Sequence, residues 1–189
     1  AINNIYLDGA LLNVVFDKNE NANYDITVVS ENTTVEESNS AEGFSFDLQS
    51  YEISNSRIYY TDKSMGITLK LDDFQHKGTG DLSLATSVLD THTDALVSFE
   101  MDSVNYLNKN KVKLDALIGI DLNQNKYSFL KNEALVNQLP LVFDGFVVVN
   151  DENQVLDLTF KTPSSDFKNF LGVMPEIYSK NIENVTTTG

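Results

Sequence analysis

The chain has 189 residues, 41% of them hydrophobic, and its 28 acidic residues against 13 basic residues give a formal net charge of −15. This is long and apolar enough for a folded domain with its own core. The acidic balance, without any cluster of Lys and Arg, argues against a nucleic-acid partner, and the absence of cysteine excludes disulfides, thiolate metal sites and a cysteine nucleophile.

Near the N-terminus, the stretch "DKNENANYD" at residues 17–25 places a side-chain oxygen at every second position. A calcium loop of the EF-hand kind needs Gly at its sixth position and a bidentate acid at its twelfth. Counted from Asp17, these positions hold Ala22 and Val28. Asn and Asp also favour tight turns, and apolar alternation flanks the stretch on both sides. We therefore predict a hairpin tip without a metal.

Residues 30–42, "SENTTVEESNSAE", are acidic and poor in apolar side chains, so we expect a mobile loop there. Strands are expected on either side of it, at Tyr24/Ile26/Val28 and Phe44/Phe46/Leu48, because apolar and polar residues alternate.

The middle of the chain has a period of two. Ile67, Leu69 and Leu71 share one side of a predicted strand, and residues 112–122 alternate in the same way for longer. Leu82/Leu84 and Val97/Phe99/Met101 repeat the pattern, and so do Leu156, Leu158 and Phe160 near the end. Short polar stretches such as "LDGA", "TDKSMG" and "LNQNK" separate the alternating segments. Strict alternation with short turns predicts antiparallel strands with one dry face and one wet face.

One segment has a helical period instead. In "SSDFKNFLGVMPEIYSK", an apolar stripe is formed by Phe167, Phe170, Leu171 and Met174. Ser164 or Ser165 can cap its start, and Pro175 should kink or restart it. We expect an amphipathic helix over residues 164–180.

No arrangement of residues points to catalysis. His76 and His92 are not spaced as zinc ligands, and there is no phosphate-binding loop or nucleophile elbow. The acid pairs Asp72/Asp73 and Asp151/Glu152 fall in expected turns, where solvation explains them. We expect a protein that is not an enzyme and that uses no cofactor or metal.

Two folds satisfy this pattern. About a dozen one-sided strands can form two sheets packed as a closed β-sandwich, which suits a binding or adhesion module of a surface or secreted protein. They can also form one long, curved sheet with an apolar groove, which needs a cover such as the helix, more chain or a lipid tail. The periodicity does not distinguish the two folds.

Two stretches resemble motifs of the AsmA-like family of bacterial envelope proteins. "NENANYDI" resembles the early hairpin of that family through Asn23, Tyr24, Asp25 and Ile26, although the family often has Gly in the turn. The segment from Ser164 to Gly189 resembles its helical segment. The matching positions there are Phe167, Lys168, Leu171, Pro175, Tyr178 and Gly189.

The resemblance implies a single β-rich domain over residues 1–189 that is a fragment of a longer chain. It implies a periplasmic location, tethered to the inner membrane by an N-terminal anchor that this sequence lacks, and a role in outer-membrane biogenesis. Its partners would be lipid acyl chains, the rest of the full-length chain and other envelope proteins.

We expect a continuous lipid-facing surface made of apolar residues from three predicted strands, with the helix as a lid. The lipid-facing residues are Ile67, Leu69, Leu71, Val112, Leu114, Ile118, Ile120, Leu156, Leu158 and Phe160. The lid residues are Phe167, Phe170, Leu171 and Met174.

Overall fold

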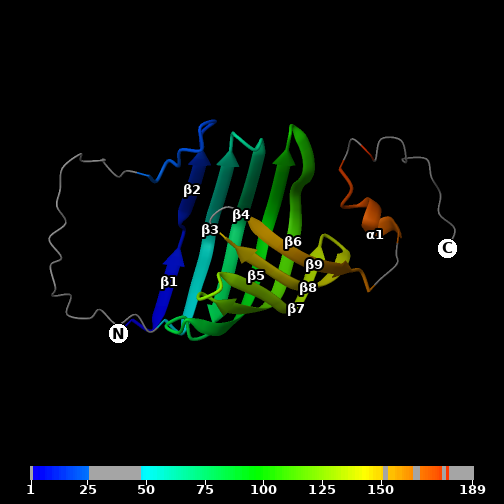
Figure 1. Ribbon diagram of the computed structural model, residues 1–189. Helices are drawn as coiled ribbons and strands as arrows, with labels where there is room; N and C mark the ends of the chain where they lie inside the picture. The colour runs from blue at the N-terminus through cyan, green and yellow to red at the C-terminus, as the bar shows by residue number, and fades with distance from the viewer. Residues whose placement is uncertain (1, 26–47, 151–152, 164–166, 176–177, 179–189) are drawn as a thin grey trace.

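The computed structural model describes residues 2–25, 48–150, 153–163, 167–175 and 178 (Figure 1). Within these residues the chain forms nine strands and one short helix. In chain order they are β1 (Asn4–Asp8), β2 (Leu11–Phe16), β3 (Ser50–Asp62), β4 (Ile67–Thr79), β5 (Thr86–Met101), β6 (Val104–Asp121), β7 (Lys126–Val136), β8 (Leu139–Val149), β9 (Gln154–Lys161) and α1 (Phe167–Leu171).

All nine described strands belong to one open sheet in the order β1-β3-β4-β5-β6-β7-β8-β9, with β2 also paired to β3. From β3 to β9 every neighbour is antiparallel and follows directly in sequence. This confirms the prediction of an all-β, mainly antiparallel fold. The described strands form a single sheet, so they do not support the alternative of two packed sheets. They also number fewer than the predicted dozen.

The hairpin turns have a common local cause. At the end of β3, the Asp62 carboxylate accepts hydrogen bonds from the backbone N–H groups of Ser64 and Met65, both at 2.9 Å. At the end of β6, Asp121 accepts from the backbone of Asn123 in the same way, at 3.0 Å. An Asp that bonds the backbone just beyond it favours a tight turn, so the stretches "TDKSMG" and "LNQNK" reverse the chain as predicted.

The first two strands differ from the prediction. The stretch "LDGA" is not a hairpin turn, because β1 and β2 lie end to end along β3 and are both parallel to it. Gly9 joins them with a φ of 68°, and its N–H donates to Ser54 O. The Ser56 hydroxyl accepts from Ala10 N at 3.0 Å and is almost fully buried. Between the end of β1 and the start of β2, these hydrogen bonds take the place of the regular pairing with β3.

The predicted strand at Leu82 and Leu84 is wrong, and the predictions for the segments around the acidic loop are not tested. Leu82 and Leu84 lie in a turn rather than a strand, because Asp81 accepts a hydrogen bond from Ser83 N at 3.0 Å and closes the chain locally. The acidic loop at 30–42, and the alternations at 24–28 and 44–48 beyond Asp25 and before Leu48, lie outside the described residues.

Only part of the predicted helix lies within the described residues. Within the described residues α1 covers Phe167–Leu171, and residues 172–174 form a turn that begins at Gly172. Of the expected range 164–180, residues 164–166, 176–177 and 179–180 lie outside the described part. The described chain thus turns at Gly172, just before the predicted kink or restart at Pro175, and Tyr178 beyond it is again helical.

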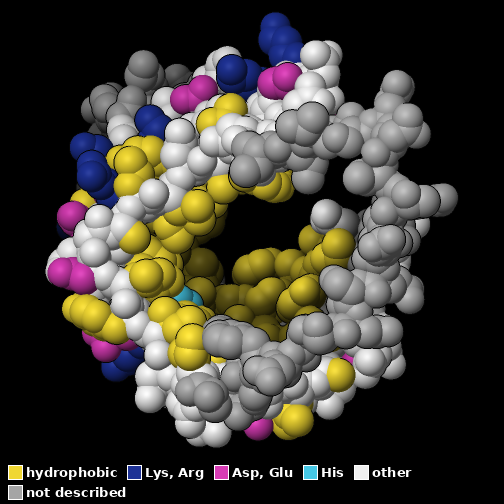
Figure 2. Space-filling model, turned by 90° about the vertical axis from the view of Figure 1, so that its left-hand side faces the viewer, with side chains coloured by type: hydrophobic (Ala, Val, Ile, Leu, Met, Phe, Trp, Pro, Cys, Tyr) yellow, Lys and Arg dark blue, Asp and Glu magenta, His cyan; other side chains and the backbone are white. Residues whose placement is uncertain are grey.

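The sheet is strongly curved. In Figure 1, β7, β8 and β9 cross in front of the long strands β3–β6. Viewed from the side of β1 and β2, Figure 2 shows a hollow lined by hydrophobic side chains, with charged side chains on the outer surface. Among the residues that the structure describes, few apolar residues are buried: Leu48, Phe74, Leu89, Ala95, Ala116 and Leu139. The concave side of one sheet thus takes the place of a core between two layers.

Candidate functional site: the concave face

The ten residues predicted to face a lipid lie on one face of the sheet. Residues paired on neighbouring strands present their side chains to the same side. The partners of the β4 and β6 members on β5 are odd-numbered residues, from Ser87 to Met101. Because side chains alternate along a strand, these odd-numbered residues share one face of β5. We call this side of the sheet the concave face.

The pairing of β6 with β7, β8 and β9 shows that the concave face extends to β9. Leu158 of β9 pairs with Gly145 of β8, which pairs with Phe129 of β7, which in turn pairs with Ile118 of β6. Leu156 and Phe160 lie two residues on either side of Leu158 and share its orientation. The structure therefore brings together side chains that are up to about ninety positions apart in the sequence.

Large apolar side chains near both edges of the concave face remain accessible. On β9, Leu156 is 58% exposed and Phe160 is 60% exposed, and on β2 Leu12 is 53% exposed. In the middle of the sheet, Leu89 of β5 and Ala116 of β6 are buried. Isolated exposed apolar residues are ordinary on protein surfaces, but a continuous apolar surface in a hollow is typical of a binding site.

A row of polar side chains crosses the concave face between β3 and β5. The Tyr51 hydroxyl lies 2.8 Å from His76 Nε2, and His76 Nδ1 lies 2.8 Å from the Thr93 hydroxyl. The Phe74 ring stacks on the imidazole, with 5.5 Å between ring centroids. Gly78 makes room for Tyr51, because a Cβ at Gly78 would lie 2.6 Å from the tyrosine ring. We call Tyr51, His76 and Thr93 the polar row.

Burial sets the charge state of the polar row. Removal of the imidazole from water lowers the pKa of His76, and the nearby His92 lowers it further. Burial also raises the pKa of Tyr51. Both groups are therefore neutral near pH 7, and the row offers hydrogen bonds rather than charge.

The sequence did not predict the polar row, and the reason is a β-bulge. Strict alternation after Leu71 would place His76 on the opposite face. Asp73 has a φ of 49°, and the register of β4 with β5 shifts between Asp72 and Gln75. This extra residue turns Phe74 and His76 onto the concave face. The only signal in the sequence is the interruption of the alternation by two adjacent aspartates.

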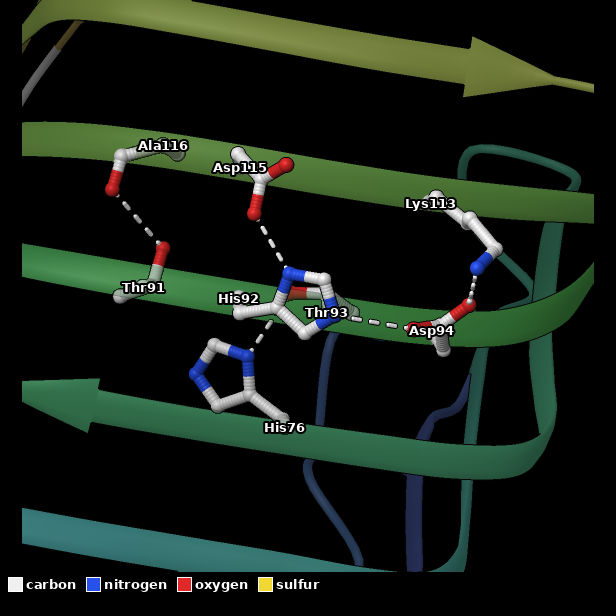
Figure 3. Close-up of polar contacts among 8 residues, drawn as sticks. All are labelled: His76, Thr91, His92, Thr93, Asp94, Lys113, Asp115 and Ala116. Carbon is white, nitrogen blue, oxygen red and sulfur yellow. Dashed lines mark hydrogen bonds and ion pairs between the residues drawn. The ribbon is translucent and has the colours of Figure 1, made fainter.

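The second histidine lies on the opposite, convex face (Figure 3). His92 Nε2 is 3.0 Å from Asp94, and His92 Nδ1 contacts Asp115. The other carboxylate oxygen of Asp94 lies 3.5 Å from Lys113 Nζ. The hydrogen bond with Asp115 raises the pKa of His92, and Asp94 adds to this effect. Among the described residues, no group of three or more acidic or histidine side chains is arranged to hold a metal ion.

The polar side chains of the stretch "DKNENANYD" form hydrogen bonds within the stretch and with β2. Asp17 accepts hydrogen bonds from the backbone N–H groups of Asn19 and Asn21, at 2.7 and 3.0 Å, and the hydrogen bond from the Asn21 side chain is the main cause that lowers its pKa. Asn23 bonds the outer edge of β2: Oδ1 accepts from Val15 N and Nδ2 donates to Asn13 O, both at 2.9 Å. The oxygens that suggested calcium thus shape the turn and cover a strand edge.

The lid residues lie near one end of β6. Strand β7 pairs with β6 only from Val112 onward. Beside the remaining half of β6, residues 172–175 border a pocket of about 570 Å³, and Asn137 Nδ2 donates to Gly172 O at 3.2 Å. Leu171 and Met174 are partly buried, Phe170 is 47% exposed, and the side chain of Phe167 lies outside the described part. Coverage of the concave face by this segment stays a prediction.

Comparisons with protein-family models, with curated proteins and with solved structures found no match to this chain. In the part of the chain that the structure describes, no helix has the length and apolar character needed to cross a bilayer.

Proposed function

We propose that this protein holds lipid acyl chains along an apolar groove formed by the concave face. The observation that carries the proposal is the largely apolar surface that runs from β2 to β9 on one side of a single curved sheet and that remains accessible near both edges (Figure 2). Solvation, rather than a chemical reaction, would be the activity.

The physical basis is the transfer of methylene groups out of water. Burying each CH₂ group of an acyl chain contributes about 0.8 kcal/mol. The same contact covers side chains such as Leu156 and Phe160, which otherwise face water. The net charge of −15 disfavours contact between the outer surface and anionic headgroups, so acyl chains entering from an end of the groove fit the charge distribution better than adsorption of the outer surface to a membrane.

The cellular setting of the proposal rests on the resemblance to AsmA-like proteins. We propose that the chain is a periplasmic part of an envelope protein tethered to the inner membrane, that it acts in outer-membrane biogenesis, and that the rest of the full-length chain and other envelope proteins are its partners. Among the described strands, β1 and β9 lie at the two ends of the sheet, and this arrangement supports the view, because a strand at the end of a sheet can pair with a further strand.

Adjacent residues on β9 provide a matched test. Leu156 lies on the concave face and Val155 on the convex face, and both are exposed, at 58% and 47%. Leu156→Asp and Val155→Asp should therefore have similar melting temperatures. A fluorescent fatty acid should bind the Val155→Asp variant like the unsubstituted protein and should bind the Leu156→Asp variant at least about fivefold more weakly, the effect of losing about 1 kcal/mol. Equal binding by both variants would contradict the proposal.

A further inference from the structure

The polar row has three hydrogens to donate but only two hydrogen bonds among its own members. A neutral imidazole has one N–H donor and one acceptor nitrogen, and each hydroxyl has one hydrogen. If Nδ1 of His76 carries the proton, it donates to Thr93, Tyr51 donates to Nε2, and the Thr93 hydrogen is left over. If Nε2 carries the proton, it donates to Tyr51, Thr93 donates to Nδ1, and the Tyr51 hydrogen is left over. In either tautomer, one hydroxyl hydrogen has no partner within the row.

The surroundings of the row make this remaining hydrogen important. Phe74 stacks against the row and Leu114 pairs with Thr93. Both are apolar and share the concave face with it. All three members of the row are partly exposed, so water can satisfy the free hydrogen while the hollow is empty. An acyl chain that fills the hollow displaces this water, and an unsatisfied donor in an apolar site is unfavourable.

We propose that the polar row of Tyr51, His76 and Thr93 is a hydrogen-bond donor site for the ester carbonyl of an acyl lipid held in the groove. This inference rests on the proposed function and adds the chemical class of the ligand, an esterified acyl chain. A carbonyl oxygen accepts the hydrogen that the row leaves over and needs no charged partner. A carboxylate is a weaker candidate, because the row is neutral and the protein carries a net charge of −15. The row would fix the depth at which an acyl chain stops.

The test compares methyl laurate with dodecane, two probes with similar alkyl chains of which only the first has a carbonyl. Each displaces 8-anilinonaphthalene sulfonate from the protein. The preference for the ester is the affinity for methyl laurate divided by that for dodecane, because only the ester loses hydration of a carbonyl when it binds. The variant Tyr51→Phe/His76→Leu/Thr93→Val removes the row with side chains of similar size, and we expect it to lower this ratio about three- to tenfold, the effect of one hydrogen bond. His76→Leu alone keeps both hydroxyls and should keep the preference for the ester.

A control with the same chemical changes is available on the other face. Tyr59 and Thr68 point to the convex side, since they pair with Lys70 and Glu100. Tyr59→Phe/Thr68→Val should leave the preference for the ester unchanged. Methyl laurate labelled with ¹³C at its carbonyl gives a second readout that needs no variant. Its infrared band should lie at lower wavenumber when bound to the protein than when dissolved in dodecane.

The outcomes separate the two proposals. If both probes bind but the preference for the ester survives loss of the whole row, or if the infrared band matches the dodecane solution, then the donor site is wrong and the groove remains. If neither probe displaces the dye, both the groove and the donor site are wrong.

Discussion

The two histidines show how much a single residue depends on the face to which it points. His76 and His92 lie on neighbouring strands, β4 and β5, and their side chains are on opposite sides of the sheet (Figure 3). On the concave side, burial lowers the pKa of His76. On the convex side, the carboxylate of Asp115 raises the pKa of His92. The sequence contains only these two histidines, so their titrations can be separated cleanly.

We predict that His92 titrates above the usual histidine pKa of about 6.5 and His76 below it. NMR spectra of the imidazole nitrogens across the pH range measure both values, and His76→Gln and His92→Gln assign the signals. If the two curves coincide, or if their order is reversed, the placement of the two side chains is wrong.

The same shifts have opposite effects on stability. The fold favours protonated His92, so its contribution to the free energy of unfolding is complete below about pH 6.5 and is lost as the pH rises through the higher folded pKa. The fold favours neutral His76, so its contribution is complete above about pH 6.5 and is lost as the pH falls through the lower folded pKa. His92→Gln should therefore destabilise the protein more at low pH than at high pH, and His76→Gln should do the reverse.

At the scale of the element, alternation predicted the faces of regular strands and failed where the backbone changes register. The apolar side of β6 from Val112 to Ile120, and that of β9, follow directly from the sequence. The bulge at Asp73 and the parallel pairing of β1 and β2 do not, because both depend on hydrogen bonds with distant strands. The apolar stripe of the predicted helix runs on through Met174 and gives no sign of the turn at Gly172 that follows α1.

Gly145 is the glycine on which the pairing of β8 with β9 depends most. Its φ is 133°, and a Cβ there would lie 1.9 Å from the carbonyl oxygen of Asp157 on β9. We predict that Gly145→Ala destabilises the protein by roughly 2–4 kcal/mol, because backbone strain and a backbone clash act together.

Gly9→Ala is the matched comparison for this substitution. Gly9 also has a positive φ, 68°, but a Cβ there meets no atom within 4 Å. Its substitution should cost only about 1 kcal/mol. Urea unfolding of the two variants measures the difference, and equal costs would mean that the contact with β9 is not as tight as described.

At the scale of the whole molecule, the sequence predicted strands with one apolar face but not how strongly the sheet curves toward that face. A period of two assigns each residue to a face and is the same in a sandwich and in a curved sheet. Curvature comes from twist and from bulges, and these arise at single residues such as Asp73 and Lys109, whose φ values are 49° and 52°. The accessible hollow follows from this curvature, and the proposed lipid groove depends on it.

Photo-crosslinking tests the central claim most directly. A benzophenone amino acid is placed at Leu69 or Phe160 on the concave face, or at Lys70 or Thr159 on the convex face. Each purified protein is irradiated with vesicles of phosphatidylethanolamine and phosphatidylglycerol, and its mass is measured. The proposed function predicts lipid adducts at the two concave positions and few or none at the convex ones. Equal yields from both faces, or no adduct at Leu69 and Phe160 in a folded protein, would contradict it.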